Sequence, residues 1–264
     1  MENNQKKFGD IPSYIKWNDE VNNPRFIPDG MNEVERNIKR IGDFLMAGVS
    51  LVVFSPLFLV CYIAVKKEDG GPAIFKQERI GRFGRPFYIY KFRSMRVDAE
   101  KNGPQLFGHK KDTRMTRVGV FHRDHHLDEL PQLWNVFKGD MAFIGPRPER
   151  KFYIDQIIEH DSRYQFLYQI RPGVTSYATL YNGYTDTMEK MLRRLELDLY
   201  YLEHRSWWFD AKILVKTFIN IIFGKKFLVF VIIYKSDLDI QRVPTRGTQV
   251  GTLCFIRGYK IRTS

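Results

Sequence analysis

The chain has 264 residues, enough to bury the core of one full domain with appendages. Its 42 lysines and arginines outnumber 30 acidic residues, and the formal net charge of +12 favours an anionic partner: nucleic acid, acidic lipid headgroups or a phosphorylated substrate. Two cysteines are too few for the disulfide framework of a small secreted domain.

Residues 1–31 are predicted to form a polar lead-in, because no apolar segment follows a basic start as it does in a secretory signal. A helix is expected to begin near residue 32, where Asn32 and Glu35 have the spacing of a capping box. Apolar residues then recur at helical spacing: Met31, Val34, Ile38 and Ile41.

This helix leads into an uncharged, mainly apolar run from Phe44 to Val65, roughly 22 residues and long enough to cross a bilayer core. Ser55 and Pro56 lie at its centre, and a proline inside a helix removes a hydrogen bond and bends it. Basic residues flank both ends, which favours the cytoplasmic side for both. The sequence therefore favours a bent, re-entrant membrane helix over residues 32–67. A straight span and a buried helix of a soluble protein are the alternatives.

The next segment, GGPAIFKQERIGRFGRPFYIYKFRSM, contains glycine-punctuated pieces, of which FYIYKF is predicted to be a strand. Lys91 and Arg93 would share one face of that strand. Arg147 and Arg171 stand beside proline in GPRPE and RPG, stiff turns that can fix a guanidinium against a phosphate, although solvated surface charge is the alternative. Neither GxxxxGK[ST] nor GxGxxG occurs, which disfavours a P-loop or dinucleotide fold.

The stretch HHLDELPQLWN places two acids, Asp128 and Glu129, directly before an amphipathic helix. The apolar positions of that helix are Leu130, Leu133, Trp134 and Phe137, and Pro131 would occupy its first turn. Asp128 is then either an N-cap or a fixed carboxylate that binds a hard cation or attacks phosphorus. The nearby histidines, His122, His125 and His126, lack a standard zinc spacing and are expected to be surface or packing residues.

Several blocks in this order resemble the bacterial sugar transferases, the monotopic phosphoglycosyl transferases, over residues 35–223. The blocks are KRIGDF, the apolar segment with its Ser-Pro pair, GGPAIFKQERIGRFGRPFYIYKFRSM, TRVG, LDELPQLWNVFKGDMAFIGPRPE, QIRPGVTSYATLYNG and LDLYYLEHRSWWFDAKILVKTF. The chain resembles the compact form, which has no preceding bundle of transmembrane helices. HRDHHL departs from the family's pattern, so the resemblance implies no contact for that loop.

The resemblance implies an α+β, mainly helical fold, with a re-entrant helix, interfacial amphipathic helices and a small cytoplasmic domain with short strands over residues 68–223. Such enzymes move a phosphosugar from a nucleotide diphosphate sugar, usually a UDP-sugar, to polyprenyl (undecaprenyl) phosphate and release UMP. They act at the cytoplasmic face of the bacterial inner membrane, in the first membrane step of polysaccharide or glycoconjugate assembly.

The resemblance also implies roles for individual residues. Asp128 would be the nucleophile that forms a covalent phosphosugar adduct and would lie beside Mg²⁺, with Glu129 assisting. The implied phosphate- and nucleotide-binding residues are Lys91, Arg93, Arg147 and Arg171, and the pair that bends the membrane helix is Ser55 and Pro56. The expected partners are a nucleotide sugar, a polyprenyl phosphate and a lipid bilayer.

Residues 224–264 lie beyond the resemblance and form a basic tail without an assigned role. Asp237 and Asp239 make a DxD pattern there, as in glycosyltransferases that release a nucleoside diphosphate, but so short a pattern is easily met by chance. The non-enzymatic alternative is a membrane-anchored basic module that binds anionic lipid or nucleic acid. RNA-type aromatic motifs are absent, so no nucleic-acid partner is expected.

Overall fold

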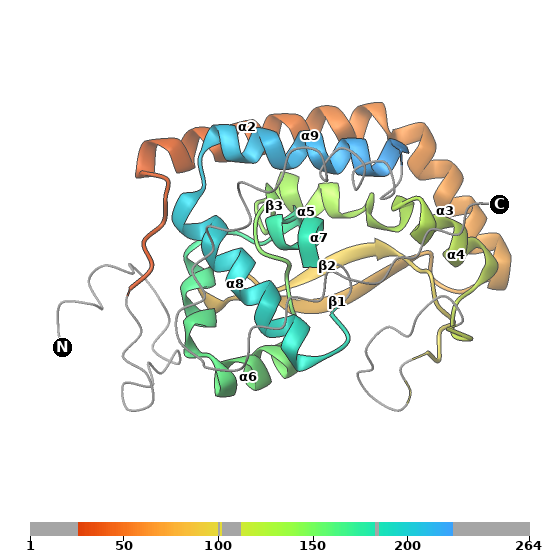
Figure 1. The fold of residues 1–264 in the computed structure, drawn as a ribbon. Helices are drawn as coiled ribbons and strands as arrows, with labels where there is room; N and C mark the ends of the chain where they lie inside the picture. Colours follow the sequence, from red (N-terminus) through yellow and green to blue (C-terminus); the bar gives the residue numbers. More distant parts are fainter. Residues whose placement is uncertain (1–25, 100, 102–111, 183–184, 224–264) are drawn as a thin grey trace, which may run out of the picture.

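The computed structural model describes residues 26–99, 101, 112–182 and 185–223. They form an α+β fold that is mostly helical with a few short strands, as predicted (Figure 1). Most of the predicted lead-in, and the whole predicted tail with its DxD pattern, lie outside the described residues.

The first described helix, α2 (Glu33–Val53), starts at the predicted capping box. Asn32 Oδ1 accepts a hydrogen bond from the Glu35 N–H at 2.9 Å, and Glu35 Oε2 accepts one from the Asn32 N–H at 2.9 Å. Two of the N–H groups that a helix start leaves without partners are thereby satisfied. The predicted helix start near residue 32 is confirmed.

The helix axis breaks at the Ser-Pro pair, where α3 (Ser55–Asp69) follows α2 at an angle of 64°. Pro56 has no N–H with which to continue the hydrogen-bond ladder of α2. The Ser55 hydroxyl instead donates to the carbonyl of Val52, with an Oγ–O distance of 2.8 Å. The missing N–H of Pro56 and the hydrogen bond from Ser55 to the Val52 carbonyl account for the break between α2 and α3.

Among the described residues, no single helix is long and apolar enough to cross a membrane, but α2 and α3 taken together as a bent pair meet that test by length and composition. The two helices expose large apolar side chains: Val34, Ile41, Leu45, Val49, Val52, Val53, Leu59 and Val60 are each more than half exposed. Helix α9 (Trp207–Phe223) runs along the same side of the molecule (Figure 1) and exposes Trp208 and Phe218. Lys39 Nζ links α2 to Asp210 Oδ2 of α9 at 2.7 Å.

Two small sheets lie beneath these helices. Strands β1 (Ile74–Ile80) and β2 (Pro86–Phe92) form an antiparallel hairpin through the 3₁₀ turn η1 (Arg82–Gly84), and β2 is the strand predicted from FYIYKF. Strands β3 (Ala142–Ile144) and β4 (Gly173–Thr175) pair in parallel.

Gly145 and Gly173 bring the GPRPE and RPG loops into backbone contact at the end of the parallel pair. A Cβ atom on Gly145 would lie 2.2 Å from the Arg171 carbonyl oxygen, and one on Gly173 would lie 2.2 Å from the Gly145 nitrogen. Only glycine leaves room for this approach. The loops that carry Arg147 and Arg171 therefore lie against each other, although the side chains of these two arginines diverge.

The remaining helices are α4 (Arg117–Asp124), η2 (Leu127–Glu129), α5 (Gln132–Lys138), α6 (Lys151–His160), η3 (Ser162–Gln169), α7 (Tyr177–Asn182) and α8 (Met188–His204). The largest apolar core joins α6, η3, α8 and α9. Its buried residues on those elements are Tyr153, Ile154, Ile157, Tyr164, Phe166, Leu167, Met191, Leu195, Leu199, Tyr201, Leu202 and Ile213.

The helix predicted to begin at the two acids begins later, at Gln132, so that prediction is wrong. Pro131 supplies no N–H, and the backbone before it forms the i to i+3 bond of a 3₁₀ turn, from Leu130 N to Leu127 O at 3.2 Å. Asp128 and Glu129 therefore lie in η2 rather than at an α-helix N-terminus, and Asp128 is not an N-cap.

Candidate active site

Asp128 and Glu129 lie on a short turn that packing and backbone conformation hold in place. Leu127 and Leu130, on either side of them, pack against an apolar cluster that contains Val65 of α3. His126, before the turn, adopts the left-handed conformation with φ 56° and separates α4 from η2. This conformation is uncommon for residues with a Cβ, although histidine tolerates it better than most. Asp128 is thereby held in a buried position, with 4% of its surface exposed.

Lys91 of β2 reaches Glu129, with an Nζ–Oε1 distance of 2.7 Å. The buried Asn135 of α5 fixes β2 beside this turn: its Nδ2 donates to the Tyr88 carbonyl at 2.7 Å, and its Oδ1 accepts from the Tyr90 N–H at 3.0 Å. A strand and a helix are therefore joined by one amide side chain, one residue away from Lys91. The sequence pattern gave no sign of this role for Asn135.

The neighbouring cations keep Glu129 ionised. Burial acts to raise the pKa of Glu129, but the charges of Lys91 and Arg147 and the hydrogen bond from Lys91 outweigh it and lower that pKa to about 2. Glu129 therefore carries its negative charge throughout the physiological pH range.

The pKa of Asp128 is shifted in the opposite direction to that of Glu129. Burial, and then the negative charge of Glu129, raise the pKa of Asp128, while Lys91, Arg123 and His126 act in part against them. Its Oδ1 is buried and has no hydrogen-bond partner among the described residues. A buried carboxylate oxygen without a partner is costly, and such atoms in native proteins mark sites where a ligand, ion or reaction completes the bonding.

The residues present fit a magnesium ion. Mg²⁺ is usually held by one or two carboxylates, with phosphate and water oxygens completing its octahedron. Asp128 Oδ1 and the ionised Glu129 supply that donor type. No group of three or more His, Cys, Asp or Glu side chains that could hold a metal ion occurs in the described ranges.

Arg147 is placed by the GPRPE loop, which β1 and α8 hold. The Ile80 N–H donates to the Glu149 carbonyl at 3.2 Å, and the Glu149 carboxylate pairs with Arg194 Nη1 at 2.5 Å. The charge of Arg147 acts to lower the pKa of Glu129, so this predicted phosphate-binding residue lies within electrostatic reach of Glu129.

Arg93 is placed differently from Lys91. It lies just beyond β2, is buried, and forms an ion pair with Asp69 at the end of α3. Its Nε and Nη1 atoms have no hydrogen-bond partner within the part of the chain that the structure describes. The spacing of Lys91 and Arg93 predicted that they share one face of a strand. They nevertheless pair with different carboxylates, Lys91 with Glu129 and Arg93 with Asp69.

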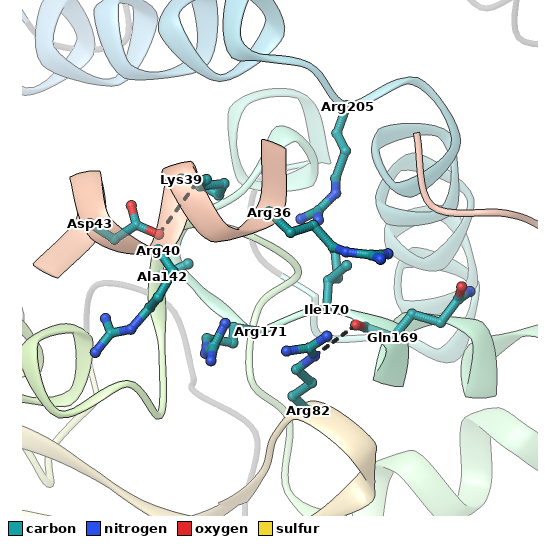
Figure 2. Close-up of a pocket in the computed structure, with 10 residues that line it drawn as sticks. All are labelled: Arg36, Lys39, Arg40, Asp43, Arg82, Ala142, Gln169, Ile170, Arg171 and Arg205. Atoms are coloured by element: carbon teal, nitrogen blue, oxygen red, sulfur yellow. Dashed lines mark hydrogen bonds and ion pairs between the residues drawn. The ribbon is translucent and has the colours of Figure 1, made fainter. Parts of the chain in front are cut away.

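Arg171 lies in a separate pocket. Its Nε donates to the Gly139 carbonyl at 2.8 Å, and it lines a hollow beneath α2 together with Arg36, Arg82 and Arg205 (Figure 2). Asp128 and Glu129 are not among the residues that line this pocket. The structure therefore brings Lys91 to the two acids and Arg147 within electrostatic reach of Glu129, and places Arg171 elsewhere.

The sequence did not indicate Arg123 and His126 as neighbours of Asp128, although both act to lower its pKa. They belong to HRDHHL, the stretch that departs from the family pattern. His122 in the same stretch is buried, and its ring centroid lies 5.7 Å from that of Phe92. The prediction that the histidines are surface or packing residues holds for His122, which packs.

Asp198 of α8 lies in the network that supports the Arg147 loop, and we expect it to make stability depend on pH. Burial raises the pKa of Asp198 to about 8, against the opposing charge of Arg194. The folded state then holds a proton that the unfolded state releases above about pH 4, so stability decreases as pH rises from about 4 to 8. Between pH 5.5 and 7.5 we expect a loss of about 2 kcal/mol in the free energy of unfolding.

Replacing this acid with its neutral isostere, Asp198→Asn, is expected to remove that slope. Urea unfolding at a series of pH values measures it. Asp155→Asn, an exposed change on α6, is the control and should keep the wild-type slope. An unchanged slope in Asp198→Asn would mean that Asp198 is ionised in the folded protein.

Comparison with protein families matches residues 34–224 to the family described as bacterial sugar transferase. A UDP-N-acetylgalactosamine-undecaprenyl-phosphate N-acetylgalactosaminephosphotransferase from Aeromonas hydrophila is 41% identical over 187 residues, which cover 71% of this chain and 44% of the relative. A UDP-glucose:undecaprenyl-phosphate glucose-1-phosphate transferase from Escherichia coli K12 is 39% identical over 189 residues, covering 71% of this chain and 40% of that protein.

A shorter relative is similar over a smaller region. A putative undecaprenyl-phosphate N-acetylgalactosaminyl 1-phosphate transferase from Bacillus subtilis is 49% identical over 119 residues, covering 45% of this chain and 66% of the relative. The matched part of the chain spans less than half the length of the Aeromonas and Escherichia proteins. The sugars in these names differ, although the lipid acceptor is the same.

Proposed function

The chain belongs to the bacterial sugar transferase family, and we propose that it moves a phosphosugar from a UDP-sugar to undecaprenyl phosphate and releases UMP. One observation carries the proposal beyond family membership. The buried Asp128 presents a carboxylate oxygen that has no partner among the described residues, beside the Lys91–Glu129 ion pair. Such a carboxylate is suited to covalent catalysis at phosphorus.

In the first step, an ionised oxygen of Asp128 attacks the phosphorus that carries the sugar. The P–O bond between the two phosphates of the donor breaks, and its electron pair leaves with UMP. The product on the protein is an acyl phosphate that links the Asp128 carboxyl to the phosphosugar. Because the pKa of Asp128 is raised, its carboxylate is more basic, and hence a better nucleophile, than an ordinary aspartate once it has lost its proton.

In the second step, a phosphate oxygen of the lipid acceptor attacks the same phosphorus. The bond between Asp128 and phosphorus breaks, the carboxylate is regenerated, and the phosphosugar is now joined to the lipid through a diphosphate. Dividing the transfer into two displacements lets a soluble donor and a lipid acceptor use one site in turn.

The surrounding charges reduce the repulsion between a carboxylate and a pyrophosphate. Lys91 supplies positive charge beside the two acids, and Arg147 supplies positive charge that acts on Glu129. Asp128 and Glu129 would hold Mg²⁺, which when bound supplies further positive charge to the pyrophosphate oxygens. Glu129, ionised and paired with Lys91, would keep the lysine oriented toward the reacting phosphates.

We further propose that α2 and α3 form a re-entrant helix that enters and leaves the bilayer on the cytoplasmic face of the bacterial inner membrane. The 64° break at the Ser-Pro pair, the exposed apolar side chains around it and the basic residues at both ends support this. The site that contains Asp128 would then lie close to the membrane surface, because η2 packs on the end of α3.

A labelling experiment tests this topology. In a chain without its two native cysteines, Asn37→Cys and Lys67→Cys place thiols at exposed positions before and after the bend. We expect a membrane-impermeant maleimide to label both from the same side of sealed vesicles. Adding Ser55→Ala and Pro56→Ala should allow a straighter helix and move the position 67 label to the other side. Opposite sides in the unaltered segment would contradict the re-entrant proposal.

Nucleotide release tests the reaction itself. The protein, held in nanodiscs with undecaprenyl phosphate and Mg²⁺, is given a panel of UDP-sugars, because the relatives differ in the sugar that they use. The proposal expects UMP and a lipid-linked diphosphosugar with at least one donor, and no product in EDTA. Release of UDP would point to a glycosyltransferase, and lack of turnover with every donor would favour the non-catalytic basic module.

A further inference from the structure

A pocket beneath α2 gathers positive charge away from the two acids (Figure 2). Six of the ten residues that line it are cations: Arg36, Lys39, Arg40, Arg82, Arg171 and Arg205. They come from α2, η1, the RPG loop and the α8–α9 connection. The pocket encloses an empty volume of about 350 Å³, which includes space open to solvent.

Carboxylates pair with only some of these cations. Asp29 accepts two hydrogen bonds from Arg205, at 2.6 and 2.9 Å, and forms an ion pair with Arg36 at 3.2 Å. Lys39 pairs with Asp210 and Asp43. Arg40, Arg82 and Arg171 form no ion pair with any described carboxylate. Asp29 acts on Arg82, and Asp43 acts on Arg171, only as neighbouring charges.

Backbone carbonyl groups hold these three arginines instead. Arg40 donates to the Val136 and Phe137 carbonyls, but Arg82 and Arg171 each donate through Nε alone, to the carbonyls of Gln169 and Gly139. The bonds from Nε aim each guanidinium, while both terminal nitrogens of Arg82 and Arg171 form no hydrogen bond with described residues. Hydrogen bonds to the carbonyls of Gln169 and Gly139 alone would not require two guanidinium groups, those of Arg82 and Arg171, so near that the charge of one acts on the other.

The arrangement is unfavourable as long as no anion is bound. Burial, then the charges of Arg171, Arg36 and Arg205, lower the pKa of Arg82 to about 10, although the charge of Asp29 acts in part against them. Burial, then the charge of Arg40, also lower the pKa of Arg171, although the charge of Asp43 acts in part against them. The fold therefore holds mutually repelling guanidinium groups together, and a bound anion would offset that repulsion.

We propose that this pocket is a second anion-binding site, which takes a phosphate group on the terminal nitrogens of Arg82 and Arg171. A guanidinium fork matches the spacing of two phosphate oxygens, which favours phosphate over a small spherical anion. The inference does not depend on the proposed transfer reaction, because the pocket shares no lining residue with the site of Asp128 and Glu129.

The pocket is placed to take phosphate from either of two sources. The pocket cations on α2 lie close along this helix to three residues with exposed apolar side chains, Val34, Ile38 and Ile41. If that apolar face contacts a bilayer, a lipid headgroup phosphate could reach the pocket. A free or soluble phosphate could reach it from water, since Arg36 at its edge is partly exposed.

Binding of inorganic phosphate to the detergent-held full chain, measured by calorimetry, tests the site. Arg82→Gln removes one fork and is expected to weaken the site about tenfold or more. Arg85→Gln makes the same charge change at an exposed position beside η1 and should bind as wild type. Lys91→Gln, which alters the site of the two acids, should leave this phosphate site intact.

Two results would overturn the inference: no phosphate binding by the wild type, or a loss in Lys91→Gln but not in Arg82→Gln. Because Arg82→Gln relieves repulsion, we expect its midpoint of thermal unfolding without phosphate to be no lower than that of Arg85→Gln. If it is lower, Arg82→Lys, which keeps the charge but not the fork, becomes the test variant, and it should also bind phosphate more weakly than wild type.

Vesicles distinguish the two sources of phosphate. Wild type and Arg82→Gln are compared on phosphatidylcholine vesicles with and without phosphatidylglycerol. A deficit of Arg82→Gln on the anionic vesicles, beyond that of Arg85→Gln, identifies the lipid headgroup as the occupant. A deficit only with free phosphate identifies a soluble occupant. Equal behaviour of the two variants with both probes would overturn the site.

Discussion

Replacing Asp128 with asparagine is expected to abolish UMP release, with a loss in kcat on the order of 10⁴-fold or more, the range seen when a reacting group is removed. Asparagine keeps the size of the side chain but lacks the nucleophilic oxygen. Because Asp128 is buried, and Glu129 adds to the rise of its pKa, removing the charge should not destabilise the fold. The rate of UMP formation and the thermal midpoint, measured on the same preparations, check both statements.

Asp124→Asn is the matched control, because Asp124 is exposed at the end of α4, four residues before Asp128. It should retain wild-type turnover. Intact mass spectrometry after donor is added without acceptor should show a phosphosugar adduct on wild type and on Asp124→Asn, but not on Asp128→Asn. Turnover by Asp128→Asn near the wild-type rate would exclude the covalent mechanism and leave Asp128 a structural residue.

Local sequence rules predicted those features that depend on neighbouring residues. The capping box at Asn32 and Glu35 needs only a spacing of three, and the break at Ser55 and Pro56 follows from the missing N–H of proline. The start of α5 could not be predicted in this way. Two conformations, a 3₁₀ turn and an α-helical turn, both accommodate Pro131, and tertiary packing of Leu127 and Leu130 decides between them.

The sequence could not predict which charged side chains come together at one site, for a different reason. Arg147 and Arg171 occur in similar Pro-containing turns, and their loops meet at Gly145 and Gly173. One side chain nevertheless acts on Glu129, while the other enters the pocket beneath α2. The direction of each side chain depends on distant partners, such as the Gly139 carbonyl for Arg171, and no spacing rule encodes these.

The apolar stripe of α5 illustrates a related point. Helical periodicity identified Trp134 and Phe137 on one face, yet the buried residues of α5 are Gln132, Asn135 and Val136, and Trp134 is 48% exposed. A surface helix of a globular protein typically packs its apolar face inward. Asn135 is buried because it joins β2, Val136 is fully buried in an apolar cluster, and Phe137 stacks with Phe44 of α2 at 4.6 Å between ring centroids. The apolar residues of α5 are therefore divided between the interior and the surface, and periodicity alone did not show which of its side chains are buried.

The second large effect is expected for Lys91→Met, which should lower kcat/KM for the donor on the order of 10³-fold at pH 7, the upper range for removing one preorganised stabilising group. Lys91 acts to lower the pKa of Asp128 as well as that of Glu129. Without it, the pKa of the nucleophile rises, so a smaller fraction of Asp128 is ionised at a given pH. The acidic limb of the pH profile of kcat/KM should therefore move to higher pH.

This shift distinguishes tuning of the nucleophile from simple loss of a phosphate contact. If Lys91 tunes Asp128, part of the defect in Lys91→Met should be recovered as the pH is raised, because deprotonation then restores the nucleophile. If Lys91 only binds phosphate, kcat/KM should fall by the same factor at every pH and the limb should stay in place. Lys76→Met, an exposed change on the neighbouring strand β1, is the control and should show neither effect. A pH profile for Lys91→Met that coincides with wild type would remove Lys91 from the site, and with it the reason for the low pKa of Glu129.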